Sequence, residues 1–247
     1  MARMSNITHT TLPNLRYLSF VGVTSYLEAL LSHMNVPLLE TLRITFFNQL
    51  SFSVPHLRQF AATTENLRSG SVRFLFYNKA VVVFMCPPVN ARVPTLSIDV
   101  RCDHLDWQVS SMAQIFNVPS PLFSTVADLT LDYRSNKLSS EWHNQADHTK
   151  WRELLRSFRN VKTLRVHDGL FEEVSRCLAL DGEPASEVLP ELKTLVCPLG
   201  SRDDKTFARF IHDRDVAGLP IDPIEDAFPT GELHYIFETP AGVEMIR

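Results

Sequence analysis

Glycine is scarce in this sequence, with eight residues in 247, and no GxGxxG pattern occurs. A phosphate-cradling loop of that type needs closely spaced glycines, so no motif indicates a nucleotide site. The four cysteines are widely separated and include no CxxC pair, which argues against a disulfide framework and a zinc knuckle. The longest apolar run, at residues 80–85, is far too short to span a bilayer.

A basic excess is also lacking, because the formal net charge is −4. Proteins whose main role is to bind nucleic acid or anionic lipid usually present a strongly positive surface, so neither partner is expected. Residues 1–11 lack the apolar core of a secretory signal peptide. We therefore expect a cytoplasmic or nuclear protein that does not associate with membranes.

What the sequence does contain is one short phrase that recurs along most of its length. The phrase is an apolar residue, two variable positions, a second apolar residue, one variable position and a third apolar residue. Recurrence of a strand-like phrase at loosely regular spacing is typical of stacked-repeat architectures. The copies are Leu15-Leu18-Phe20, Leu39-Leu42-Ile44, Leu57-Phe60-Ala62, Val126-Leu129-Leu131, Val161-Leu164-Val166 and Leu192-Leu195-Cys197.

The spacing of apolar residues predicts strands that alternate with helices. Alternation such as Leu42-Arg43-Ile44 indicates a strand with one buried face. Between these strands, apolar residues recur at three- and four-residue spacing, which predicts amphipathic helices. Strands joined by helical crossovers should pair in parallel, so we expect an α/β solenoid. The helical positions are Leu27, Leu30, Leu31 and Met34; Leu105, Val109, Met112 and Phe116; Trp151, Leu154, Leu155 and Phe158; Phe171, Val174, Cys177 and Leu178; and Phe207, Phe210 and Ile211.

Two local patterns add detail to this expectation. Ser25 and Glu28 have the spacing of a capping box, which predicts that the first helix begins at the serine. Residues 71–86 contain two apolar stretches around Asn78-Lys79, which predicts one β-hairpin inserted in the solenoid.

The chain is expected to have three regions. Residues 1–11 are predicted to be a disordered N-terminal segment, and residues 12–218 the repeat domain. Residues 219–247 are predicted to form a C-terminal capping strand or tail, which contains the alternating Leu233, Tyr235 and Phe237. Within the repeat domain, residues 134–150 are polar and are expected to form an exposed loop.

Residues 12–15 (Leu-Pro-Asn-Leu), 37–42 and 158–166 resemble the leucine-rich-repeat region of fungal F-box proteins, particularly those of basidiomycetes. Residues 46–50, 54–57 and 105–109 strengthen the likeness, which covers roughly 12–218. The resemblance implies a leucine-rich-repeat-like solenoid. It is an irregular one, because the asparagine that closes each regular repeat is missing.

The resemblance also implies a role. F-box proteins of this type are similar to substrate receptors of cullin–RING ubiquitin ligases, in which the F-box docks to an adaptor and the repeats hold a protein client. No F-box is evident in this sequence, so binding of the adaptor is expected only if an F-box is supplied elsewhere.

The densest cluster of reactive residue types is at residues 99–104. Cys102 and His104 would supply the nucleophile and base of a hydrolase-like site. The alternative is that Cys102 packs as a small hydrophobic residue and that His104 belongs to the turn that follows. No third orienting residue is identifiable from the sequence, so we predict no catalytic residue.

His143, Asp147 and His148 are candidate metal ligands, because residues four apart converge on one helix face. The segment is polar and offers no fourth ligand, so we predict neither a metal nor a cofactor. The acidic pairs Glu172-Glu173 and Asp203-Asp204 are explained by their positions in the first turns of predicted helices, where negative charge complements the helix dipole.

The remaining candidate is a surface made by the outward-facing positions of the strands. Stacked parallel strands align such positions on one concave face, where arginine and tyrosine are typical of protein interfaces. The alternative is that these residues are only solvated. The predicted partner-binding residues are Tyr17, Arg43, Asp99, Arg101, Asp132, Arg134, Arg165 and His167.

The function expected from the sequence is a non-enzymatic protein-interaction module that binds a protein client. Two alternatives remain open. One alternative is a truncated or decaying repeat protein without a dedicated partner. The other is a hydrolase-like enzyme that uses Cys102 and His104.

Overall fold

The computed structural model describes residues 10–47, 49–87, 94–116, 123–134, 148–179, 187–200, 204–225, 238–239 and 242–243. The strands are β1 (Thr10–Thr11), β2 (Tyr17–Gly22), β3 (Met34–Asn35), β4 (Thr41–Phe46), β5 (Ser71–Tyr77), β6 (Ala80–Cys86), β7 (Leu96–Val100), β8 (Asp128–Tyr133), β9 (Thr163–Val166), β10 (Thr194–Cys197), β11 (Asp222–Glu225), β12 (Glu238–Thr239) and β13 (Gly242–Val243). The helices are α1 (Thr24–Leu31), α2 (Pro55–Thr63), α3 (Leu105–Phe116), α4 (His148–Arg156), α5 (Asp168–Leu178) and α6 (Lys205–Val216), with a short 3-10 turn, η1 (Glu65–Leu67).

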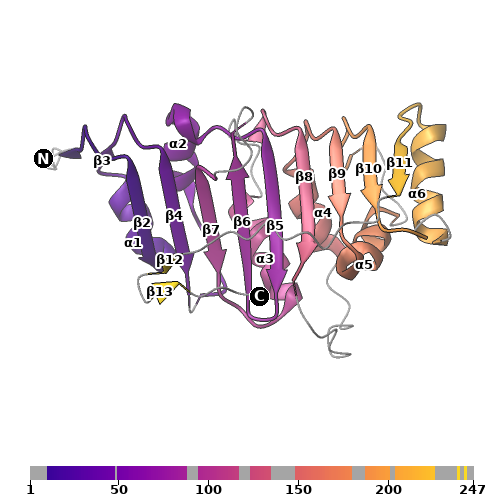
Figure 1. The fold of residues 1–247 in the computed structure, drawn as a ribbon, viewed down its shortest axis with the longest axis horizontal. Coiled ribbons are helices and arrows are strands. Elements are labelled where there is room, and N and C mark those ends of the chain that lie inside the picture. Colours follow the sequence, from indigo (N-terminus) through magenta and orange to yellow (C-terminus); the bar gives the residue numbers. More distant parts are fainter. Residues whose placement is uncertain are drawn as a thin grey trace, which may run out of the picture.

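Nine of the strands form one sheet in the order β11-β10-β9-β8-β5-β6-β7-β4-β2 (Figure 1). Strand β6 runs antiparallel to its neighbours β5 and β7, and every other neighbouring pair in this sheet is parallel. The fold is therefore α/β with a large mixed sheet that is mostly parallel. The predicted β-hairpin is confirmed, since β5 and β6 are joined by a turn at Asn78 and Lys79.

The hairpin lies in the middle of the sheet. After β4 and α2 the chain enters β5, which is three positions away from β4, and β6 and β7 then return to fill the positions between them. Two pairs of strands that follow one another in the sequence, β4 with β5 and β7 with β8, are therefore not neighbours in the sheet. A succession of adjacent parallel units is interrupted at this point by strand β6, because its two-residue turn forces it to run antiparallel to β5.

The middle apolar residue of the recurring phrase occupies one row across the sheet. Leu18 is paired with Leu42, and Leu42 with Leu96, on one side of the hairpin. Leu129, Leu164 and Leu195 are paired in the same way on the other side. Val72 and Met85 of the hairpin join the two halves of this row. The predicted strands are thus in register.

The helices gather on one side of the sheet: Figure 1 shows α1 to α5 behind it and α6 at its β11 end. One face of each strand packs against this layer, as at Phe74, whose ring meets those of Phe116 and Phe158 edge to face at 5.5 and 5.9 Å. Trp151 of α4 is fully buried in the same core and lies against Phe76. The predicted apolar faces of α3 and α4 are thus buried. The face of the sheet opposite the helices is called the open face below.

The predicted capping box at the start of α1 is wrong. The helix begins at Thr24, and its N-cap residue, Val23, has no side chain that can accept a hydrogen bond. Glu28 caps α2 instead, because its carboxylate accepts hydrogen bonds from the backbone N–H groups of His56 and Leu57 at 2.7 and 2.9 Å. The glutamate therefore stabilises the neighbouring helix through a tertiary contact.

One copy of the phrase is helical. Leu57-Phe60-Ala62, predicted as a strand, lies in α2, which starts at Pro55. Proline is favoured in the first turn of a helix because it has no N–H to leave unsatisfied. The apolar spacing also suits a helix, since Leu57, Phe60 and Ala61 are buried on one side of it.

The two edges of the sheet are β2 and β11. Thr10 and Thr11, expected in a disordered segment, form β1 and pair with β3, while residues 1–9 lie outside the described residues. Within the predicted C-terminal region, β11 pairs with β10, whereas Leu233, Tyr235 and Phe237 lie outside the described residues. Most of the predicted polar loop, residues 135–147, lies outside them as well.

None of the helices in the described part of the chain combines the length and the apolar character that crossing a bilayer requires.

Candidate functional site

The strand register places the outward-facing residues of the open face in rows that run across the sheet. The central row contains three arginines and one phenylalanine among smaller side chains. A second row, one pleat further along the strands, contains two aspartates. The central row is Ser19, Arg43, Ser97, Phe84, Arg73, Thr130, Arg165, Val196 and Ile224. The second row is Val21, Thr45, Asp99, Val82, Leu75 and Asp132.

The middle of the open face is apolar and buried. Phe84 is only 2% exposed and Leu75 only 5%, although neither belongs to the core that packs against the helices. Cys86, two residues along from Phe84 on the same side of β6, is also buried. We call Leu75, Phe84 and Cys86 the central patch. The predicted surface includes no residue of the hairpin, although the nearly continuous apolar sequence of β5 and β6 is typical of strands buried on both faces.

A cluster of charged side chains lies beside this patch. The Asp132 carboxylate, 2% exposed, accepts hydrogen bonds from Arg73 Nη2 at 2.7 Å and from Arg134 Nε at 2.9 Å. His167 Nδ1 lies 3.5 Å from the other carboxylate oxygen. The structure therefore brings together three predicted residues, Asp132, Arg134 and His167. It adds Arg73, which lies on the hairpin and was not predicted.

Asp99 occupies a different environment on β7. Its Oδ1 atom is buried and has no hydrogen-bond partner in the described part of the chain. Burial raises the pKa of this carboxyl group to about 6, although the nearby Arg101 opposes the shift. The side chain of Arg101, which follows β7, is exposed. Asp99 is thus an acid that titrates close to neutral pH on the open face.

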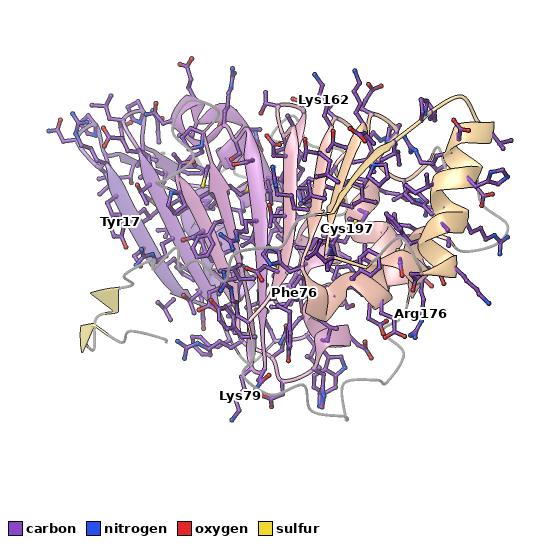
Figure 2. All side chains as sticks on the ribbon, turned by 45° about the vertical axis from the view of Figure 1, so that its right-hand side comes forward. Tyr17, Phe76, Lys79, Lys162, Arg176 and Cys197 are labelled. Atoms are coloured by element: carbon purple, nitrogen blue, oxygen red, sulfur yellow. The ribbon has the colours of Figure 1, made fainter. Side chains whose placement is uncertain are left out.

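The other predicted residues are spread along the sheet. Arg43 lies in the central row on β4, and Arg165 is exposed on β9. Tyr17, 49% exposed, is on the edge strand β2, as Figure 2 shows. Five strand spacings separate β2 from β8, or about 24 Å at the usual 4.8 Å. Tyr17 therefore does not belong to the Asp132 cluster.

The surroundings of Cys102 do not favour a nucleophile. Burial, together with the neighbouring Asp103 and Asp99, raises the pKa of its thiol to about 12, whereas a reactive cysteine needs a lowered pKa. His104 lies with its ring centre 4.8 Å from that of Trp107, in an edge-to-face contact. The histidine is thus placed against an aromatic ring on α3.

The prediction that acidic pairs lie in the first turns of helices is supported only in part. Asp204 is the N-cap of α6, where its side chain accepts a hydrogen bond from the backbone N–H of Phe207 at 2.8 Å. Glu172 and Glu173 instead pair with Arg176 of the same helix. His143 and Asp147 lie outside the described residues, as does the side chain of His148. Within the described ranges no three His, Cys, Asp or Glu side chains are grouped so that they could hold a metal ion.

An apolar cavity of about 420 Å³ opens at the β2 end of the sheet. Its walls come mainly from leucine and methionine side chains, so it offers few polar groups that would orient a small substrate. The lining residues are Thr10, Leu12, Leu15, Leu18, Ala29, Leu30, His33 and Met34.

The open face thus presents a buried apolar centre, a paired charge cluster and exposed arginines. The chain matches no protein-family model, no curated protein and no solved structure.

Proposed function

We propose that this chain is a non-enzymatic protein-interaction module whose open face binds a protein partner. The observation that carries the proposal is the central row, in which Arg73 is paired directly with Phe84 across the hairpin and Arg43 and Arg165 lie further out on either side. Protein interfaces are enriched in arginine and aromatic residues around a desolvated centre. A mixed surface of this kind suits a protein better than a polyanion.

The finer description of the fold is part of the same proposal: an irregular leucine-rich-repeat-like solenoid. It is supported by strands that are each followed by a helix, as in β8-α4, β9-α5 and β10-α6, and by the shared row of Leu129, Leu164 and Leu195. In such an arrangement the outward strand positions of successive units form one continuous surface.

The resemblance to F-box proteins suggests what the partner does. We propose that the partner is a client protein held by the repeats of a ubiquitin-ligase receptor, and that an adaptor is recruited only where an F-box is supplied elsewhere. The presence of adaptor and cullin subunits among captured proteins would support this part of the proposal. A reproducible partner without those subunits would limit the role to client binding.

The test compares capture of partners from native cells by the wild-type chain and by an Arg101→Glu, Arg165→Glu variant. Both arginines are exposed on the open-face side, so reversing their charge should leave the fold intact. Arg73 is left unchanged because its pairing with Asp132 makes it part of the structure. We expect the proteins captured by the wild type to be depleted at least tenfold with the variant.

The matched control is Arg159→Glu with Lys205→Glu, which makes the same charge change at exposed positions after α4 and at the start of α6. Partners should bind this control as they bind the wild type. If a folded open-face variant captures the same partners at wild-type levels, the open face is not the binding surface. If the control loses them equally, binding depends on net charge alone.

A further inference from the structure

Strand β2, at one end of the sheet, has a free edge in the described part of the chain. It stands last in the order of the nine strands, and β4 is its neighbour on the inner side (Figure 1). The carbonyl of Arg16 accepts a hydrogen bond from the backbone N–H of Thr41, so the even-numbered residues of β2 direct their backbone groups toward β4. The backbone groups of Tyr17, Ser19 and Val21 therefore point away from the sheet, where another strand can pair with them.

The two edges of the sheet differ in the features that oppose pairing with another chain. Strand β11 contains Asp222, Pro223 and Glu225, and edge strands are commonly protected by proline and charged side chains. The N–H of Asp222 bonds to the carbonyl of Lys193, so the next residue, Pro223, faces the outer edge and offers it no N–H. The sequence of β2, Tyr-Leu-Ser-Phe-Val-Gly, contains neither proline nor charge. The edge at β2 is thus chemically open to strand addition.

The apolar residues of β2 are also less buried than their counterparts one strand further in. Leu18 and Phe20 are only partly buried, whereas Leu42 and Ile44, which are paired with them in β4, are fully buried. The apolar cavity described above adjoins the same strand, because Leu18 is part of its lining. A further strand beside β2 would remove more of this apolar surface from water.

The sequence of β2 is complementary to itself when two copies run antiparallel. A two-fold axis at Ser19 places the two serines opposite each other, Tyr17 opposite Val21, and Leu18 opposite Phe20. Residues directly opposite one another lie on the same face of the sheet, so aromatic and aliphatic side chains meet on both faces and no charges oppose each other. The outward-pointing residues Tyr17, Ser19 and Val21 form the hydrogen-bonded pairs of this register, and the two residues of each pair would exchange two N–H···O bonds.

We propose that two copies of this chain associate through β2, in this antiparallel register, so that one sheet continues from copy to copy. A strand of an unrelated protein could also add to the edge. The symmetric match of Tyr17 with Val21 and of Leu18 with Phe20 around a small central residue favours a second copy. The interface is isologous, as in most homodimers.

The two-fold axis is perpendicular to the sheet, so both open faces lie on the same side of the dimer. Ser19 belongs to the central row, which therefore continues across the junction. Arg43 of one copy lies three strand spacings from Arg43 of the other, or about 14 Å. That separation exceeds the Debye length of about 8 Å at physiological ionic strength, so repulsion between the two arginines is largely screened.

The dimer presents two open faces in one direction. A partner with two binding sites would then bind by avidity, and this consequence rests on the proposed function. Formation of the dimer does not depend on whether such a partner exists.

The first test compares the association of the full-length wild type with that of a Ser19→Lys variant by analytical ultracentrifugation. Ser19 is exposed, so one chain accommodates the lysine, whereas the dimer would place two lysines directly opposite each other. We expect the dissociation constant of the dimer to rise at least tenfold. The matched control is Ser51→Lys, which adds the same charge at an exposed position between β4 and α2 and should leave the constant unchanged.

A wild type that sediments only as a monomer at concentrations from about 1 µM to about 100 µM would overturn the proposal. Unchanged association of the Ser19→Lys variant, shown by circular dichroism to be folded, would also overturn it. Equal weakening in the Ser51→Lys control would mean that association follows net charge and not pairing at β2.

The second test measures the register by disulfide formation under mild oxidation. Opposite residues of a hydrogen-bonded pair have Cα atoms about 5.5 Å apart, which suits a disulfide, so Ser19→Cys should form a covalent dimer. Val21→Cys lies on the same face of the same strand, but its two copies would be roughly 14 Å apart along the strands. It should not form a covalent dimer by itself.

A mixture of Tyr17→Cys and Val21→Cys chains should form a disulfide between the two different variants, which mass spectrometry of the linked peptides identifies. The wild type, which has four cysteines of its own, gives the background. Equally efficient linking of Ser19→Cys and Val21→Cys, or no linking of Ser19→Cys above background, would contradict the proposed pairing.

These outcomes separate the dimer from the proposed function. A monomeric wild type whose partners are lost in the Arg101→Glu, Arg165→Glu variant would remove the dimer and leave the proposed function intact. A dimer linked through Ser19→Cys, with no partner sensitive to those two arginines, would do the reverse.

Discussion

Arg73 of β5 donates a 2.7 Å hydrogen bond to the buried carboxylate of Asp132 on β8. The two strands are parallel neighbours, and the pair is diagonal, because Arg73 is directly opposite Thr130 and Asp132 is opposite Leu75. The contact therefore joins the central hairpin to the parallel strands that follow it. It also holds a charge in place beside the apolar central patch.

Replacing Asp132 by Asn should destabilise the fold strongly. The substitution keeps the shape but removes the negative charge, so Arg73, whose side chain is 20% exposed, is left without its ionic partner. Breaking a buried pair in this way typically costs about 3–5 kcal/mol. Urea denaturation measures the loss. The exposed pair of Arg16 and Glu40 is the control, and Glu40→Gln should cost less than about 1 kcal/mol. Similar small losses in both variants would show that the Arg73–Asp132 pair is not structurally important.

Replacing Glu28 by Ala should destabilise the protein, whereas replacing Ser25 by Ala should not. Glu28 accepts two backbone hydrogen bonds at the start of α2, and loss of such a cap typically costs about 0.5–2 kcal/mol. Ser25 is exposed and lies inside α1 rather than at its N-cap. Thermal denaturation of the two variants distinguishes the tertiary cap from the local capping box. Equal losses would favour the local box.

That contrast shows where the sequence is informative about the fold and where it is not. The strands at Leu42, Leu129 and Leu164 and the helices between them follow from local periodicity, which a buried face imposes on its own segment. The hairpin at residues 71–86 is also a local feature, because a two-residue turn joins its strands. Its place between β7 and β8 depends on pairing with distant strands, and no local pattern specifies those partners.

The residues of the candidate site also fall into two groups: those that local sequence patterns predict and those that depend on how distant strands pair. Asp132, Arg134 and His167 are predictable as outward-facing residues, because alternation along β8 and β9 places them opposite the leucines. Their convergence on one carboxylate requires the register between the two strands. Arg73 and Phe84 enter the site only because the hairpin is inserted in the sheet, so they could not be found by extending the parallel phrase.

Replacing Asp99 by Asn should stabilise the protein at neutral pH. The pKa of Asp99 is raised from 3.8 to about 6 in the folded state, so the folded state binds more protons than the unfolded state between these values. Stability contributed by this group therefore falls as pH rises from about 4 to about 6 and stays low above that range. We expect a gain of roughly 1–3 kcal/mol for Asn at pH 7 and little difference at pH 4. Urea denaturation at the two pH values measures it, and a gain that is the same at both would contradict the assignment.

Adjacent residues of β9 provide the sharpest test of which face is buried. Leu164 is fully buried against the helix layer, so Leu164→Ala should lower the free energy of unfolding by about 2–5 kcal/mol. Arg165 is exposed on the open face, and Arg165→Ala should change it by no more than about 0.5 kcal/mol. Urea denaturation of both variants at one pH compares the two effects directly. A strand shifted by one residue would reverse their order, because successive side chains point to opposite faces of a sheet. Since the central row is built from the same register, a reversal would also remove Arg165 from the proposed binding surface.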